Sequence, residues 1–270
     1  MDNNISGIVN DKKKLKAFLE GIYYVYARRE LVYPDPLWYL YKYDDVKDRE
    51  IVGLIASSLA YGRVAQIMKS VERVLACLGS KPREYLLKHG DSDIVPSSFK
   101  HRFTTSADMN NLLRNIRGVV MKYETIENFA EECIKISGGD MISGLSKFAD
   151  ELSKNRAEKS YRLVCSPSNL SPCKRLFLFL RWLVRSDSVD PGGWLILTPA
   201  NLLIPCDTHM LHIANLLHFT SSTAPSFKTL QQISSAFKSL CPSDPAKYDF
   251  PLTRFGIRTG LSISLLQFYS

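Results

Sequence analysis

The sequence lacks any apolar run long enough to cross a membrane. Its apolar stretches fall well short of the roughly 18–20 consecutive residues that a membrane-spanning helix requires. Residues 1–6 are polar and acidic, without the basic-then-apolar pattern of a signal peptide. We therefore expect a protein that has no membrane span and acts in the cytoplasm. Its 270 residues suffice for one domain or for two closely packed lobes.

Close pairs of cysteines are also missing. The six cysteines are scattered along the chain and include no Cys-x-x-Cys pair, which favours free thiols in a reducing compartment. His209 and His212 stand one helical turn apart beside Cys206 and Asp207, but no further ligand is spaced to complete a zinc site. We therefore expect neither a metal nor another cofactor.

Signals for β-strands are sparse, and only residues 194–197 resemble a short strand. Apolar residues instead recur at the three- and four-residue spacing of amphipathic helices. The spacing, together with the proline and glycine positions, predicts an all-α fold with helices over residues 12–29, 45–60, 64–78, 106–137 (two helices that meet near Glu124), 141–152, 173–185, 207–217, 226–240 and 244–255.

The charge balance is positive. The formal net charge is +8 and the isoelectric point lies near 9.1. An excess of this kind draws a protein towards polyanions such as nucleic acid or an anionic membrane. The charge alone does not choose between these partners.

An aspartate opens one of the predicted helices. Pro205 fixes the chain just before this helix, and Asp207 stands at its start. An aspartate in this position accepts the free backbone N–H groups and is stabilised by the helix dipole. Asp207 is therefore either a helix cap alone or a carboxylate held ionised and oriented for catalysis.

Lys174 opens another predicted helix, over residues 173–185. Arg181 and Arg185 follow on about the same face, and the opposite face is apolar. A lysine beside apolar surface and other cations has its charged form disfavoured, which frees the amine as a nucleophile. The alternative is a solvated basic face that contacts phosphates.

Residues 203–214 resemble the signature of the helix-hairpin-helix DNA glycosylase superfamily, in which an aspartate follows a proline at a helix start. In bifunctional members a lysine on the preceding helix attacks the sugar, and Lys174 and Asp207 match these two positions. Their separation of 33 residues resembles that in the archaeal 8-oxoguanine glycosylases. Residues 54–75 are similar to the early helix-loop-helix whose turn enters the lesion site. Over nearly its whole length, including residues 244–257, the chain also resembles the bacterial domain-of-unknown-function 2400 (DUF2400) family.

The chain departs from the superfamily in three places. The usual hairpin turn binds a phosphate through glycine N–H groups, whereas residues 166–174 contain no glycine. The four-cysteine iron–sulfur loop of some members is absent from the sequence. The Asn-rich turn of the eukaryotic 8-oxoguanine enzymes is replaced by Leu-Ala-Tyr-Gly-Arg at residues 59–63. Phosphate binding must therefore differ, and no cluster is expected.

The resemblance implies a single unit, residues 1–270, of two helical lobes with a central cleft. It implies a monomeric base-excision repair glycosylase with AP-lyase activity that acts on damaged double-stranded DNA at an oxidised purine such as 8-oxoguanine. Asp207 would stabilise the sugar cation and Lys174 would form a Schiff base. Flat rings would hold the flipped base, and basic side chains the phosphates. The candidates are Tyr61, Tyr248, Phe250 and Trp38 for the base, and Arg63, Arg175, Arg181, Arg185 and His209 for the backbone.

Two alternatives stay open at this point. A helical module can bind nucleic acid through its basic surface without catalysis, and a glycosylase fold can lose its activity and serve as a scaffold. Aromatic residues are also more often core than ligand pocket. The behaviour of a Lys174→Gln variant separates a binder, which tolerates the change, from a lyase, which does not.

Overall fold

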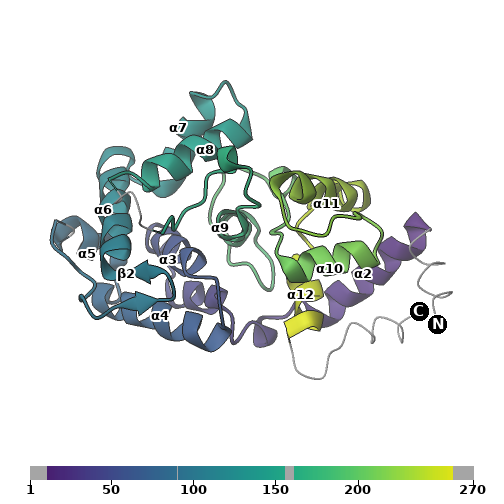
Figure 1. The fold of residues 1–270 in the computed structure, drawn as a ribbon, viewed down its shortest axis with the longest axis horizontal. Helices are drawn as coiled ribbons and strands as arrows, with labels where there is room; N and C mark the ends of the chain where they lie inside the picture. Colours follow the sequence, from purple (N-terminus) through teal and green to yellow (C-terminus); the bar gives the residue numbers. More distant parts are fainter. Residues whose placement is uncertain (1–10, 90, 156–160, 258–270) are drawn as a thin grey trace.

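The protein is mostly helical, which confirms the all-α expectation (Figure 1). The structure, a computed structural model, describes residues 11–89, 91–155 and 161–257. The helices are α2 (Lys12–Tyr26), α3 (Val46–Ser58), α4 (Val64–Leu78), α5 (Pro82–His89), α6 (Ser106–Tyr123), α7 (Ile126–Lys135), α8 (Met141–Leu152), α9 (Lys174–Val184), α10 (Thr208–Leu216), α11 (Phe227–Leu240) and α12 (Asp249–Ile257). Short 3-10 turns are η1 (Arg29–Leu31), η2 (Pro36–Lys42), η3 (Pro167–Asn169) and η4 (Pro199–Asn201), and strands β1 (Lys100–His101) and β2 (Thr104–Thr105) form one antiparallel hairpin.

Most helices begin at a polar side chain that accepts a backbone N–H of the first turn. Each such cap contributes about 1 kcal/mol and fixes where the helix starts. The capping residues are Asp11, Asp45, Thr105, Thr125, Asp140, Asp207 and Ser226. This local chemistry explains why most predicted helix starts agree with the structure to within one residue.

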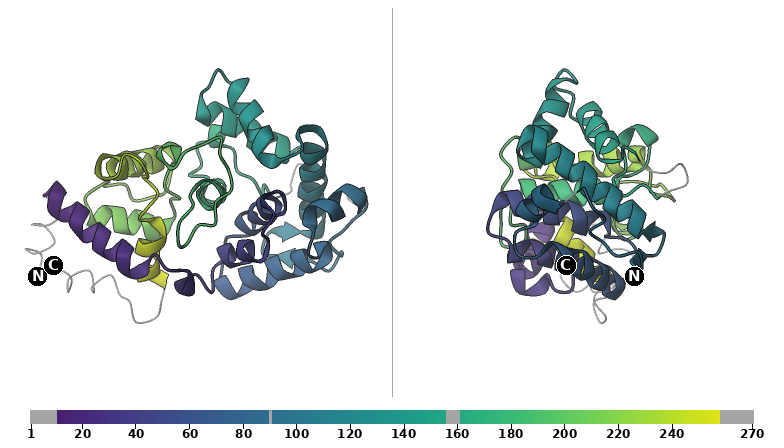
Figure 2. Two further views of the ribbon diagram at one scale, coloured as in Figure 1. Left: turned by 180° about the vertical axis from the view of Figure 1, so that it is seen from behind. Right: turned by 90° about the vertical axis from the view of Figure 1, so that its left-hand side faces the viewer.

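Helix α9 lies at the centre of the molecule, between two groups of helices (Figures 1 and 2). Helices α3 to α8 form one group. Helices α10, α11 and α12 form the other, and the N-terminal helix α2 joins it by packing on α12. Helix α9 packs on α3, where Gly53 lets the two approach closely, because a Cβ there would stand 2.9 Å from a Leu183 methyl group.

The core around α9 is aromatic as well as aliphatic. Phe179 is fully buried, with its ring 6.3 Å from that of Phe148 and 5.1 Å from that of Trp194. Burial of a side chain of this size contributes on the order of 1.5–3 kcal/mol. Among the described residues, no helix is both long and apolar enough to span a membrane.

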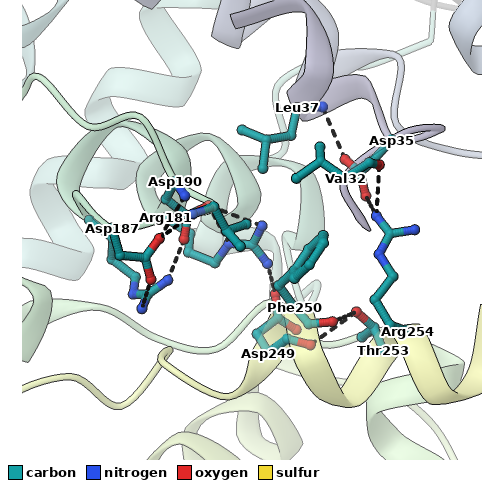
Figure 3. Close-up of polar contacts among 12 residues, drawn as sticks. Val32, Asp35, Leu37, Arg181, Asp187, Asp190, Asp249, Phe250, Thr253 and Arg254 are labelled. Atoms are coloured by element: carbon teal, nitrogen blue, oxygen red, sulfur yellow. Dashed lines mark hydrogen bonds and ion pairs between the residues drawn. The ribbon is translucent and has the colours of Figure 1, made fainter. Parts of the chain in front are cut away.

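Arg181 in α9 and Arg185 directly after it are buried, so they do not form a solvated basic face. Arg181 binds Asp190 and Asp249 (Figure 3). Arg185 binds Asp190 and also Asp187 and Asp244. The predicted phosphate contacts of Arg181 and Arg185 are therefore wrong. Other parts of the protein cover Arg181 and Arg185, and a buried cation must be paired with carboxylates.

Several predicted elements differ from the structure. Helix α12 begins at Asp249 rather than at residue 244, and α2 ends at Tyr26 rather than at residue 29. Residues 194–197 form no strand, since the N–H groups of Leu195 and Ile196 are donated to the Glu127 carboxylate. Helix α5 and the β1–β2 hairpin were not predicted. Both are short, so the apolar periodicity that identifies longer elements is missing.

Candidate active site

Lys174 and Asp207 are in direct contact. Lys174 is the first residue of α9, and its Nζ donates to Asp207 Oδ2 at 2.6 Å. Asp207 caps α10, where its Oδ1 accepts the backbone N–H groups of His209 and Met210, both at 2.9 Å. The two positions that match the superfamily's lysine and aspartate are thus in direct contact. The carboxylate thus uses one oxygen as a helix cap and the other to bind the lysine.

The backbone holds Asp207 firmly. The N–H of Ile204 donates to Ser234 Oγ of α11 at 2.9 Å, and Pro205 restricts the chain between this anchor and the helix start. The side chains of Lys174 and Asp207 are 36% and 23% exposed. A half-buried pair of this kind is oriented by protein contacts and still reachable by a ligand.

Asp207 is ionised at neutral pH. Burial by itself raises the pKa of this carboxyl, but the Lys174 charge and hydrogen bond and the Met210 N–H together outweigh it. The net result is a pKa below the ordinary value of an aspartate. The site therefore combines a fixed negative charge with a primary amine.

The pair lies in a cleft of about 690 Å³. The floor of the cleft is formed by residues on one face of helix α9. The walls are formed by the α3–α4 turn and by the starts of α10 and α12. The lining includes five residues that the sequence assigned to base or phosphate binding: Tyr61, Arg63, Arg181, His209 and Phe250. Figure 3 shows Phe250 projecting from α12 between Arg181 and Arg254, whose guanidinium lies 4.4 Å from the Phe250 ring.

Two aromatic candidates lie away from the cleft. Tyr248 is fully buried and donates its hydroxyl to Glu20 of α2, so it joins α12 to α2. Trp38 packs edge-on against Tyr33 and Tyr41 and is not among the residues that line the cleft. The prediction that these two rings hold a base is wrong, because both already pack against the protein's own side chains.

Arg175 is also unavailable for phosphates. It is 8% exposed and donates to the carbonyls of Ser58 and Arg162. Its guanidinium lies 5.2 Å from the Tyr61 ring and 5.0 Å from the Tyr161 ring. Arg175 therefore positions these rings, a role that its place in the sequence did not indicate.

The cleft also contains polar groups that sequence reasoning missed. Asp249 is buried in its wall, where burial raises the pKa to about 6 against the opposing effect of Arg181. The indole N–H of Trp182 is buried and has no hydrogen-bond partner in the described part of the chain. The only sequence signal for Trp182 was its spacing of two helical turns from Lys174, which places both on one face of α9.

The thiols beside the pair are poor nucleophiles. Cys173 and Cys206 adjoin Lys174 and Asp207 in sequence, and burial raises the pKa of each thiol to about 12. Both are therefore protonated at neutral pH. Within the described ranges, no group of three or more His, Cys, Asp or Glu side chains is arranged to hold a metal ion. The exposed nucleophile of the cleft is the Lys174 amine.

Comparison with known proteins identifies a family. No curated protein and no solved structure matches the chain significantly. A family model described as a protein of unknown function, DUF2400, matches residues 35–258, which include Lys174, Asp207 and every residue that lines the cleft. The chain therefore belongs to the DUF2400 family.

Proposed function

We propose that the protein is a DNA glycosylase with AP-lyase activity, in which Lys174 is the nucleophile and Asp207 stabilises the sugar cation. The observation that carries the proposal is the 2.6 Å contact between the Lys174 amine and a helix-capping carboxylate, inside a cleft open to solvent. A lysine at one helix start and an aspartate at the next is also the arrangement implied by the resemblance to the helix-hairpin-helix glycosylases.

The size and lining of the cleft support a nucleoside as ligand. Its volume of about 690 Å³ lies within the range of roughly 300–1,000 Å³ of small-molecule sites. Tyr61 offers a partly exposed ring, and the buried Phe250 ring adds apolar surface to the wall. The buried Trp182 N–H is a donor without a partner among the described residues, and Asp249 is an acceptor. These groups suit the faces and the polar edge of a flipped purine. The choice of an oxidised purine such as 8-oxoguanine rests on the resemblance.

The reaction proceeds by nucleophilic substitution at the sugar. The C1′–N bond breaks with its electron pair going to the base, and the base leaves with a proton that Lys174 gives up. The freed amine attacks C1′ while Asp207 stabilises the positive charge on the sugar. A second amine proton passes to O4′ as the C1′–O4′ bond opens, which leaves a protonated Schiff base. A C2′ proton then passes to water, and its bonding electrons form the C2′–C3′ double bond as the C3′–O bond to the 3′ phosphate breaks.

Phosphate binding is proposed at one edge of the cleft. Arg63 and His209 are exposed there, and neither side chain has a carboxylate ion-pair partner within 4 Å among the described residues. Arg63 precedes helix α4 and caps it with no side-chain hydrogen bond, so no side chain at the N-cap accepts the first N–H groups of a helix whose start lines the cleft. Cations and free helix N–H groups are the usual partners of DNA phosphates.

Borohydride trapping on duplexes with single lesions tests the proposal. The wild-type protein should form a covalent protein–DNA adduct, and Lys174→Gln should form none while keeping its fold. The matched control is Lys228→Gln on α11, which removes the same charge at an exposed position outside the cleft. Trapping by Lys174→Gln, or no adduct and no base release by the wild type on any lesion, overturns the assignment and favours a binding module.

A further inference from the structure

The hairpin β1–β2 presents an aromatic side chain to solvent. Its two-residue turn consists of Arg102 and Phe103. Phe103 is 64% exposed, and Arg102 has a φ of 51°, a conformation that favours glycine. Hairpin turns are normally built from glycine, asparagine and aspartate. The turn therefore departs from the usual turn residues, with an arginine at positive φ and an exposed phenylalanine.

The hairpin is held rigidly against the α3–α4 turn. The Tyr61 hydroxyl donates to the His101 carbonyl at 2.9 Å and contacts Thr104 Oγ1 at 2.7 Å. The buried His101 ring in turn contacts the Tyr61 carbonyl at 3.0 Å. Gly62 leaves room for Arg102, because a Cβ on Gly62 would stand 2.7 Å from Arg102 Cδ. The exposed turn is thus fixed beside the cleft residues Tyr61 and Gly62.

A ladder of rings connects the cleft to Phe103. The Tyr61 ring lies 5.1 Å from the Tyr161 ring at an interplanar angle of 37°, and Tyr161 lies 5.8 Å from Phe103 at 36°. Arg175 lies over the first two rings from the inside, and Arg102 lies 5.4 Å from the Phe103 ring. The ladder begins at a wall of the cleft and ends in solvent.

We infer that Phe103, with Arg102, is a stacking platform for an unpaired base next to the nucleotide in the cleft, on the same strand. The inference rests on the proposed function only in taking the ligand to be a nucleic acid. If the reacting nucleotide lies beside Tyr61, the nucleic-acid strand continues along the row of rings. The next base on that strand then reaches the exposed Phe103 ring.

The surrounding charge favours a nucleic acid over an apolar peptide. Arg63, Lys100 and Arg102 are exposed, and none has a carboxylate ion-pair partner within 4 Å in the described ranges. A nucleotide supplies both a flat ring for Phe103 and a phosphate for these cations, whereas an apolar peptide leaves them unpaired. The ligand class is therefore a single-stranded or locally opened segment with at least two adjoining nucleotides.

The test uses a single-stranded oligonucleotide with a tetrahydrofuran abasic analogue flanked by 2-aminopurine. Phe103→Ala should weaken its binding roughly 5- to 150-fold and abolish the fluorescence change, while Phe103→Trp should retain both. Met121→Ala is the matched control, because Met121 is 61% exposed and lies about four turns along α6 from the hairpin. Phe103 is exposed, so its removal leaves the core intact.

The outcomes separate this inference from the proposed activity. If Phe103→Ala binds the oligonucleotide as the wild type does, or if the wild type binds no such strand, the platform is wrong even where Lys174 is trapped. The same measurement is made on a duplex with 2-aminopurine in the complementary strand. A fluorescence change that appears only in that duplex also overturns the inference. If Phe103 controls binding but no adduct forms on any lesion, the platform stands and the lyase proposal fails.

Discussion

The two oxygens of Asp207 have different tasks, and two substitutions separate them. Asp207→Asn keeps one oxygen for the N–H groups of His209 and Met210 but turns the other into an amide that cannot accept from Lys174. Asp207→Ala removes both oxygens. The first change therefore removes the negative charge alone, and the second removes the charge and the cap.

The magnitudes follow from these contacts. Since asparagine caps as well as aspartate, Asp207→Asn should change the free energy of unfolding by less than about 1 kcal/mol, whereas Asp207→Ala should cost about 1–2 kcal/mol. Both should slow borohydride trapping by roughly two to four orders of magnitude, which corresponds to about 3–5 kcal/mol of transition-state stabilisation. Single-turnover trapping and urea unfolding measure the two effects separately.

Asp140→Asn is the matched control. Asp140 caps α8 by accepting the Ser143 N–H, so the same chemical change occurs at a helix start outside the cleft, and trapping should be unaffected. Trapping by Asp207→Asn within a factor of about two of wild type would show that the charge has no catalytic role. A loss of stability as large as that of Asp207→Ala would show that the cap is misassigned.

Two further predictions concern buried charges. Arg181→Met should cost about 3–5 kcal/mol of unfolding free energy in urea titrations, because Asp249 is left buried without its cation and Asp190 keeps only Arg185; a cost below about 1 kcal/mol contradicts the ion network. Burial raises the pKa of Glu50 to about 7, whereas the pKa in the unfolded chain is near 4.5. The protonated Glu50 side chain therefore contributes fully to stability below about pH 4.5, and this contribution is lost as the pH rises through about 7. Relative to Glu50→Gln, the wild type should lose on the order of 2–3 kcal/mol over that range, and parallel pH profiles of the two proteins would refute the shift.

The helix starts were predictable because they depend on contacts between residues close in the sequence. Contacts between residues far apart in the sequence were not predictable in this way. Asp45 and Ser226 identify helix starts because a cap and its N–H partner lie within a few residues. The face of α9 was misassigned because the aspartates that neutralise Arg181 and Arg185 come from a loop and from α12. A helical pattern records which residues share a face, but it does not record what covers that face.

The candidate site likewise contains residues that a local motif identifies and residues that only the fold places. Lys174 and Asp207 were found through a motif, and the structure places their side chains in direct contact. Tyr248 and Phe250 are two residues apart on one segment, and only the fold decides that the first contacts α2 and the second the cleft. The hairpin with Phe103 escaped prediction because two-residue strands around an Arg-Phe turn carry no strand or turn signal.

The last prediction compares Arg63 and Arg175, which the sequence assigned to the same role. Arg63 is exposed at the cleft edge without an ion pair among the described residues, whereas Arg175 is buried under Tyr61 and Tyr161. Arg63→Met should reduce the slope of log affinity against log salt by about 0.9, the value for one phosphate contact, and leave stability unchanged. Arg175→Met should leave the slope unchanged and cost about 2 kcal/mol of unfolding free energy, because the buried Ser58 carbonyl and the part-buried Arg162 carbonyl lose their donor. A reduced slope for Arg175→Met would mean that this side chain reaches DNA, which its buried contacts do not permit.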